Sequence, residues 1–445
     1  MQRNINPAIT EKNVYGKKFW LMMCVFYALF IIRIVLRIHF PVVLYLAWVL
    51  VMALAFDDNE IKALVISFIP LSSGFQYKYA MFICIVALIV KYYKRLRVNS
   101  IILIGSALMV WELLHFGIGT PSLIELARGF AELLFLMIVL CLPSKRRICV
   151  SEVTRLLAIS STVAFVILLF ATVAGRGQSI LDLMQNGFRF GISEDTGGSF
   201  VFRFNSNALG TICNLAIAGL LINIYNKSAK LVDYFMIVFM VFIGLLTVSR
   251  TFLLCLGIMV VLFVLLQRKS LMRRVLTVFA LATVGTLMLI VIINYFPSII
   301  DNYNNRLNVE DISNGRSFLF GYYNDVIFSS ARNIFFGIGI QQIATKSYGI
   351  TGIMADVPHN GVQQVVVAWG IPGLVLMILF IYKLVKQGNT NKKSPLLYYL
   401  PLLISLITSL PGQFVTVPAK MLSLLFIFEI FNNSKIDVGG KKNAE

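Results

Sequence analysis

Long apolar segments alternate with short polar segments along almost the entire chain. Most of the apolar segments approach the roughly 20 residues that a helix needs to cross a bilayer. The pattern therefore predicts about fourteen membrane-spanning helices, and at least twelve. The expected ranges are 19–37, 40–56, 61–75, 78–93, 100–117, 121–142, 153–174, 206–225, 232–248, 251–267, 275–296, 361–382, 396–411 and 418–432. The range 61–75 is short and contains Pro70, so it also fits a re-entrant segment.

Composition narrows the class of protein. Of the 445 residues, 58% are hydrophobic and only 13% are charged, well below the roughly 25% of a soluble domain. A soluble chain of this size needs more charge to cover its surface, and a disordered chain needs lower hydrophobicity. These values exclude a soluble enzyme, an extracellular binding module and a disordered protein. They predict an all-α polytopic membrane protein.

The net charge of +19 is explained by membrane topology. Basic clusters occupy alternate connections between the predicted helices, at 17–18, 91–97, 145–147, 227–230, 268–274 and 383–393. Because cytoplasmic loops are enriched in Lys and Arg, this pattern places both chain termini in the cytoplasm. The excess charge therefore does not indicate a nucleic-acid partner.

This orientation places two long polar segments outside, at 175–205 and 297–360. A helix is expected near 316–330 within the second segment, and a loop of this length usually carries function. The expected organisation comprises an N-terminal half of about seven spans with the first outer loop (1–205), central spans (206–296), the long extracytoplasmic loop (297–360), and C-terminal spans with a tail (361–445).

No cofactor is expected. The chain contains neither GxxxxGK[ST] nor GxGxxG, so an ATP-driven pump or a transferase of nucleotide sugars is unlikely to be its class. The six cysteines include no CxxC pair, which argues against a zinc site or a disulfide framework.

Ionisable residues in the fifth and sixth spans are the first candidates for function. Glu112 and His115 share one helix face, and Glu125, Arg128 and Glu132 share another. They form either an internal ion-pair network that locks two helices together or a site in which Arg128 meets an anionic ligand.

Three further arginines lie on the expected outer side. Arg203 stands just above the eighth span, close to a helix N-terminus that favours an anion. Arg250 sits in a tight connection between the ninth and tenth spans, where interfacial anchoring is the alternative role. Arg316 falls in the first turn of the expected helix of the long loop. A cation is unfavourable there unless an anion such as phosphate accompanies it.

The end of the long loop supplies a candidate base. His359 stands just before the twelfth span with Asp356 and Asn360 beside it, and the segment 337–340 before it reads as flexible. Arginine suits bidentate phosphate recognition, and histidine suits proton abstraction from a hydroxyl near neutral pH. These residues predict an outward-facing, metal-independent site for an anionic ligand carried by a lipid.

Four segments resemble one known family. They are FRFNSNALG at 202–210, SRTFLL at 249–254, NGRSFLFGYYNDVIFSSARNIFFGIGIQQ at 314–342 and PHNGVQQVVVAWGIPG at 358–373. Their order and spacing resemble the O-antigen ligase/Wzy-type polysaccharide polymerase superfamily over about residues 200–385. The resemblance implies the all-helical glycosyltransferase type C-like fold and a location in the bacterial plasma membrane.

The resemblance also implies a chemistry. Undecaprenyl-diphosphate-linked glycans would serve as donor and acceptor at the outer face of the membrane, without nucleotide or metal. Arg316, Arg250 and Arg203 would hold the diphosphate, and His359 would deprotonate the acceptor hydroxyl. Asn207, Arg128, Asn360, Asp356 and Glu112 are the further expected substrate contacts. A flippase and a chain-length regulator are the partner proteins that such a reaction implies.

Three functions are compatible with these residues. The leading one is a polymerase that joins lipid-linked repeat units into a capsule, exopolysaccharide or O-antigen chain. The second is a ligase that moves a finished glycan to a terminal acceptor by the same chemistry. The third is a lipid-linked oligosaccharide flippase or other transporter, which would favour paired repeats and charges at the membrane midplane instead of polar residues on one side.

The basic clusters at 268–274 and 383–393 generate a topology prediction, because they flank the two spans that bracket the long loop. A cysteine introduced at Asn304 should react with a membrane-impermeant thiol reagent on intact cells. Labelling that occurs only after lysis would overturn the predicted orientation. A cysteine at Asn391, in the expected cytoplasmic connection, is the matched control and should react only after lysis.

Overall fold

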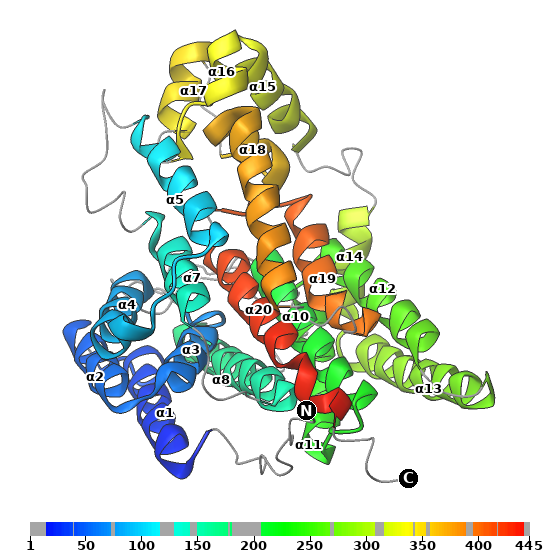
Figure 1. Cartoon of the computed structure of the whole chain (residues 1–445). Helices are drawn as coiled ribbons and strands as arrows, with labels where there is room; N and C mark the ends of the chain where they lie inside the picture. Colours follow the sequence, from blue (N-terminus) through cyan, green and yellow to red (C-terminus); the bar gives the residue numbers. More distant parts are fainter. Residues whose placement is uncertain are drawn as a thin grey trace, which may run out of the picture.

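The described part of the chain is helical throughout. The computed structural model describes residues 15–38, 40–72, 76–115, 129–142, 149–176, 179, 206–267, 271–307, 316–340, 343–352, 357–388, 395–415 and 417–439. No strand occurs among these residues. Figure 1 shows the helices as one bundle with a smaller helical layer at one end.

The N-terminal half forms one side of the bundle. Its helices are α1 (Lys17–Phe30, continued by a π-helix at Ile31–Val35), α2 (Val43–Ala55), α3 (Asp58–Phe68), α4 (Tyr77–Tyr92), α5 (Ser100–Leu113), α7 (Ala131–Cys141) and α8 (Val150–Arg176). Local sequence sets several of these boundaries. Asp57 and Glu60 form a reciprocal capping box at the start of α3, and Asn99 caps α5.

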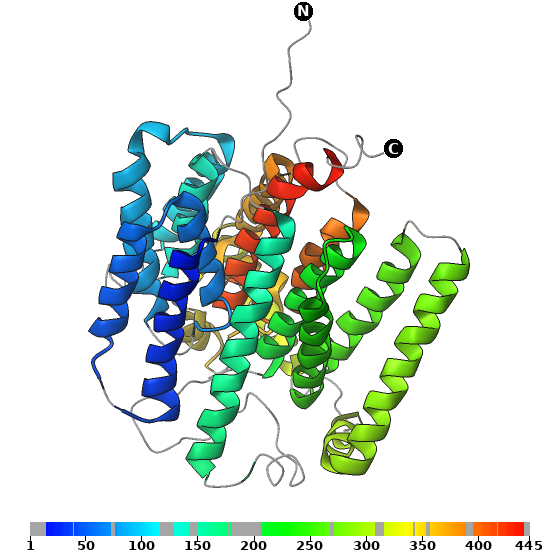
Figure 2. The same cartoon turned by 90° about the horizontal axis from the view of Figure 1, so that it is seen from below.

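The central and C-terminal helices form the rest of the bundle. They are α10 (Ser206–Tyr225), α11 (Leu231–Leu246), α12 (Arg250–Leu266), α13 (Leu271–Tyr295), α18 (Gly361–Gly388), a 3-10 turn (Leu396–Tyr399), α19 (Leu400–Ser409) and α20 (Pro418–Gly439). Seen from below, α1, α8 and α13 run in broadly similar directions (Figure 2). Such an arrangement suits helices that share one bilayer.

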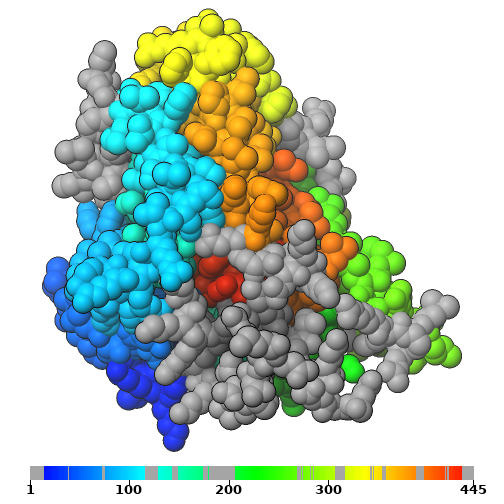
Figure 3. Space-filling model, in the orientation of Figure 1, coloured from blue at the N-terminus to red at the C-terminus, as the bar shows by residue number. Residues whose placement is uncertain are grey.

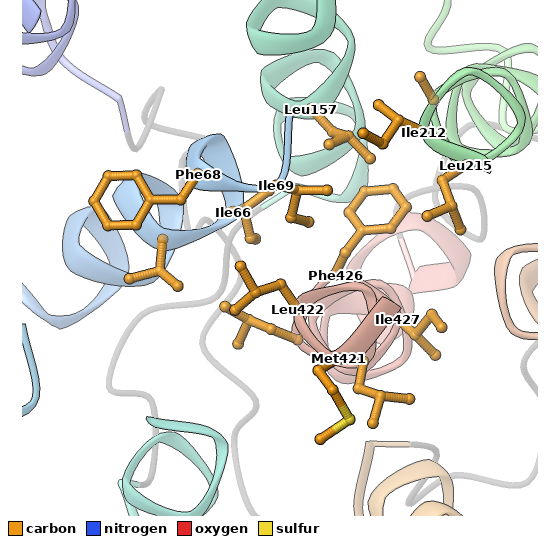
Figure 4. Packing of buried hydrophobic residues seen from close by; sticks show 14 of the residues in the cluster. Ile66, Phe68, Ile69, Leu157, Ile212, Leu215, Met421, Leu422, Phe426 and Ile427 are labelled. Carbon is orange, nitrogen blue, oxygen red and sulfur yellow. The ribbon is translucent and has the colours of Figure 1, made fainter. Parts of the chain in front are cut away.

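The core lies where α20 meets α3, α8 and α10. Ile66 lies in the last turn of α3 and Ile69 directly follows that helix. Leu157 belongs to α8 and Leu215 to α10. All four side chains are buried near Phe426 of α20 (Figure 4). One buried ion pair joins the same helices, because Lys62 Nζ lies 3.0 Å from a carboxylate oxygen of Glu429. An isolated charge would be costly at this depth, so each residue supplies the partner that the other needs.

Four short helices occupy the segment that was expected to be the long outer loop. They are α14 (Pro297–Leu307), α15 (Arg316–Phe328), α16 (Ala331–Phe336) and α17 (Ile343–Thr351). The helix predicted near 316–330 is confirmed as α15. We call α15–α17 the cap, because they lie together beyond the ends of α5 and α18 (Figure 1). In Figure 3 the yellow cap, the cyan α5 and the orange α18 form one continuous surface.

The predicted apolar ranges correspond well to helices, but the number of spans is not settled by them. Each of the fourteen ranges overlaps a helix, although residues 121–128 of the sixth range lie outside the described part. Five described helices are long and apolar enough to cross a membrane, at Lys17–Val35, Val150–Val173, Ser206–Tyr225, Arg274–Tyr295 and Gly361–Lys386. The count of fourteen therefore stays a prediction, whereas the all-helical, membrane-type architecture is confirmed.

The segment 337–340 is not the flexible connection that its glycines suggested. Ile338 N–H donates to the Val367 carbonyl (2.9 Å), and Gly339 N–H donates to the Ala368 carbonyl (2.8 Å). These carbonyls can accept bonds from outside the helix because α18 is kinked at Gly370, where φ is +66°. The expectation of flexibility was wrong because these glycines permit close backbone docking instead of loose motion.

A glycine substitution tests this docking. A Cβ at Gly370 would lie 2.5 Å from the Phe335 carbonyl group and would require a left-handed backbone. Gly370→Ala should lower the midpoint of thermal unfolding of the purified protein by several degrees, because at least about 2 kcal/mol of strain results. Gly349→Ala is the matched control. A Cβ there meets open space within α17, so stability should be unchanged or slightly higher. Equal effects of the two changes would contradict the docking.

Candidate active site

One cavity brings together four of the residues singled out from the sequence, Arg250, Arg316, His359 and Asn360. It has a volume of about 660 Å³ and is lined by Arg250, Thr251, Leu254, Arg316, Ser317, Phe320, His359, Asn360, Gln363, Ile407, Leu410 and Pro411. Arg250, Arg316 and His359 come from segments far apart in the sequence. We refer to these three residues and the space between them as the anion site.

The cavity lies at the N-terminal ends of three helices. Arg250 is the first residue of α12, Arg316 is the first residue of α15, and Asn360 directly precedes α18. Unpaired N–H groups make the first turn of a helix the positive end of its dipole. Arginines at these ends add to the positive potential instead of neutralising it. The arrangement is therefore suited to an anion.

A strained turn precedes Arg250 and positions it beside the cavity. Only residues 247–249 separate α11 from α12, and Val248 adopts a positive φ of 49° that β-branched residues rarely tolerate. Ser249 caps α12 by accepting from Phe252 N–H, and its hydroxyl donates to Asn207 Oδ1 at 2.9 Å. The tight connection expected at this point is confirmed. Asn207 does not line the cavity, and its described contact secures the turn that carries Arg250.

Arg316 has little to balance its charge. No hydrogen bond or ion pair to an acid involves this guanidinium within the described ranges. Burial, followed by the positive charge of Arg250, lowers the pKa of Arg316. Two cations that repel each other in a partly desolvated cavity are stabilised when an anion binds between them.

Amide side chains hold α15 and α18 together around the site. Asn360 Oδ1 accepts from Val362 N–H and Gln363 N–H, both at 3.0 Å, and so caps α18. Gln363 Nε2 donates to the Phe320 carbonyl (2.7 Å) and to Asn324 Oδ1 (2.9 Å) of α15. These bonds fix Arg316 and His359 relative to each other. Asn360 lines the cavity, but its side-chain oxygen already accepts the two N–H groups at the start of α18.

Part of the cavity lining is apolar. Ile407, Leu410 and Pro411 form what we call the wall, and Leu254 and Phe320 extend the apolar surface. Gln364 fixes the chain beyond the wall, because its Oε1 accepts from Phe414 N–H (2.9 Å) and Val415 N–H (3.0 Å). A ligand with a charged group and an apolar portion matches such a cavity.

Glu112 occupies a different place from the one expected. It is 3% exposed, and its carboxylate accepts from Ile340 N–H (2.9 Å) and from Trp369 Nε1–H (2.6 Å). It therefore ties α5 to the docked segment and to α18, and it does not line the cavity. Glu132, on the neighbouring α7, accepts from Tyr77 and lies 3.9 Å from Lys78. Glu132 thus has an internal ion pair, whereas the described partners of Glu112 are hydrogen-bond donors; the choice between the two interpretations stays open, because Arg128 lies outside the described residues.

Some predicted site residues lie outside the described part of the chain. They are Arg128, Arg203 and Asp356. Sequence reasoning did not single out Gln363, Gln364 or the wall. Gln363 and Gln364 directly follow the His-Asn pair in PHNGVQQ, so their position was a usable signal. The wall had no polar signature and could not be found without the fold.

The described residues contain no group of three or more His, Cys, Asp and Glu side chains placed to hold a metal ion. The chemical groups that do converge on the cavity are two guanidinium groups, one imidazole and the amides of Asn360 and Gln363. This set can bind a dianion, neutralise charge that develops on it and accept one proton.

A family model matches the part of the chain that contains three of the four motif segments, at 249–254, 314–342 and 358–373. Residues 235–378 match the family described as O-Antigen ligase, and the matched segment contains Arg250, Arg316 and His359. A search of curated proteins finds no match. The apolar helices indicate a membrane protein, and the family match relates residues 235–378 to O-antigen ligases. Over this segment, the resemblance of the chain to the O-antigen ligase/Wzy-type superfamily is confirmed.

Proposed function

We propose that the protein is a polysaccharide polymerase that joins lipid-diphosphate-linked oligosaccharide repeat units at the outer face of the bacterial plasma membrane. The observation that carries this proposal is the cavity in which Arg250, Arg316 and His359 meet at three helix N-termini beside an apolar wall. Undecaprenyl diphosphate bearing a glycan has the matching parts: a diphosphate for the arginines, a lipid for the wall and a sugar near the histidine.

The reaction follows from these groups. An acceptor hydroxyl attacks the anomeric carbon of the donor, a carbon–oxygen bond forms there, and the bond between that carbon and the diphosphate breaks. The electron pair leaves with the lipid diphosphate, which gains one negative charge that Arg316 and Arg250 stabilise. His359 takes the hydroxyl proton and becomes cationic. Because the attack is a single displacement, the anomeric configuration inverts, so an α-linked donor gives a β linkage.

A ligase that transfers a finished glycan is the second candidate, and the family description favours it directly. The chemistry at the diphosphate is the same, and the two functions differ only in the acceptor. A flippase or transporter has less support, because transport of a lipid diphosphate requires cations to bind it but no base beside them, and His359 supplies a candidate base. In either enzymatic case a flippase must deliver the donor, and a chain-length regulator is the further partner expected for a polymerase.

The arginines provide the first functional test. Arg316→Lys and Arg250→Lys keep the charge but lose the bidentate fork, so polymer formation should fall at least about tenfold with normal protein levels. Arg332→Lys is the matched control, because Arg332 is exposed on α16 and does not line the cavity. Activity should be unchanged in that control. A fully active Arg316→Ala protein would refute the proposed diphosphate clamp.

The histidine provides the second functional test, read as glycan length on cells. His359→Ala should lower the transfer rate by about 10²–10⁴-fold and leave single lipid-linked repeats in the membrane, while donor binding is largely kept. Long lipid-linked chains that never transfer would instead identify a ligase, and repeats trapped on the cytoplasmic side would identify a flippase. Near wild-type polymerisation by purified His359→Ala protein would exclude His359 as the base.

A further inference from the structure

A buried lysine that the reaction above does not use lies behind the wall. Lys420 belongs to the first turn of α20 and is 4% exposed. Its ammonium donates to the Thr408 carbonyl at 2.6 Å, near the C-terminal end of α19. That contact offsets part of the cost of burying the charge, because a helix C-terminus is the negative end of its dipole. An ammonium group has three donors, however, and one carbonyl does not neutralise it.

Lys420 differs from Lys62, the buried lysine of α3 that contacts α20. Lys62 is paired with Glu429 at 3.0 Å. Lys420 has no acidic partner within the ranges that the structure describes. It also stands in the first turn of a long helix, where a cation is unfavourable. The fold thus keeps a desolvated amino group at a place that would suit an apolar residue better.

The position of this charge relates it to the anion site. Gly412 follows the wall directly, and a Cβ built on it would lie 2.9 Å from Lys420 Nζ. The bond from Lys420 Nζ to the Thr408 carbonyl places the ammonium beside the segment of α19 in which Ile407 and Leu410 line the cavity. Lys420 therefore lies on the protein side of the wall, while Arg316 and Arg250 lie on the cavity side.

We propose that Lys420 is a positioning residue of the anion site, which supplies a third positive charge from behind the wall and anchors the wall through Thr408. The inference rests on the proposed function and deepens it, because the added charge favours a diphosphate over a monophosphate. In a low-dielectric surrounding, a charge acts across a few ångströms of protein without touching the ligand. The cost of burying Lys420 is then compensated when the diphosphate binds.

The test measures thermal unfolding of the purified full-length protein in detergent, with inorganic diphosphate or inorganic phosphate added. Lys420→Met has a similar size and no charge. It should raise the unfolding midpoint without ligand, because a buried charge is removed, and it should weaken diphosphate binding about tenfold or more. Binding of inorganic phosphate should change less. Lys420→Arg keeps the charge and should retain most of the diphosphate affinity.

Lys62→Met is the matched control, since it removes a second buried lysine near α20. It should lower the unfolding midpoint, because Glu429 loses its ion-pair partner, and it should leave diphosphate affinity unchanged. A difference in sign between the two methionine variants would show that Lys420 is held for its charge toward a ligand and not for the fold.

The outcomes separate this inference from the proposed function. If Lys420→Met is less stable and binds diphosphate normally, Lys420 is a structural residue and the inference is overturned. If that variant does not fold, Lys420→Gln keeps a donor for the Thr408 carbonyl without the charge, and the same affinity comparison decides. If Arg316→Ala and Arg250→Ala also bind diphosphate normally, the proposed diphosphate clamp itself fails.

Discussion

Repulsion between like charges is the interaction on which the rest of this site depends. The helices α12 and α15 each begin with an arginine, and both arginines face one cavity together with the N-terminus of α18. Such a concentration of positive charge costs free energy in the absence of an anion, and the cost increases as water is excluded. The fold must therefore supply enough rigidity to hold these groups together, and a bound anion would offset the remaining cost.

Several devices supply that rigidity, and each acts on the backbone beside a functional side chain. The positive φ of Val248 and the hydrogen bond of Ser249 to the first turn of α12 set the position of Arg250. Asn360 accepts from Gln363 N–H at the start of α18, and the Gln363 side chain joins α18 to α15. Gln364 fixes the connection behind the wall. A strained residue next to a candidate catalytic group is typical of sites in which the remaining structure over-determines the geometry.

The sequence was most informative where a residue violated its local preference. Arg316 was conspicuous because the first turn of a helix does not favour a cation, and Arg250 because it stands in a tight connection; both line the cavity. Helix positions could be predicted from hydropathy because a long apolar segment in a bilayer must satisfy its backbone hydrogen bonds internally, and a helix does so. Glu112 was misleading. A buried acid on an apolar helix signals a partner, but sequence cannot say whether that partner is a ligand or, as here, Trp369 and a backbone N–H. The wall and Lys420 depend on how α19 and α20 pack, and local patterns carry no information on that packing.

The contact between Glu112 and Trp369 has a consequence for how the two halves of such proteins can vary. Through it, a helix of the N-terminal half is hydrogen-bonded to the same kinked helix that begins beside His359. Changes in the N-terminal half leave this connection intact only while this one acid and this one indole are kept as a pair. A chimaera that joins the first half of one relative to the second half of another would inherit a working anion site and still lose its alignment if the carboxylate came without the indole. The N-terminal half of the molecule is thus coupled to the helix that carries His359 through a buried hydrogen bond and not through a loop.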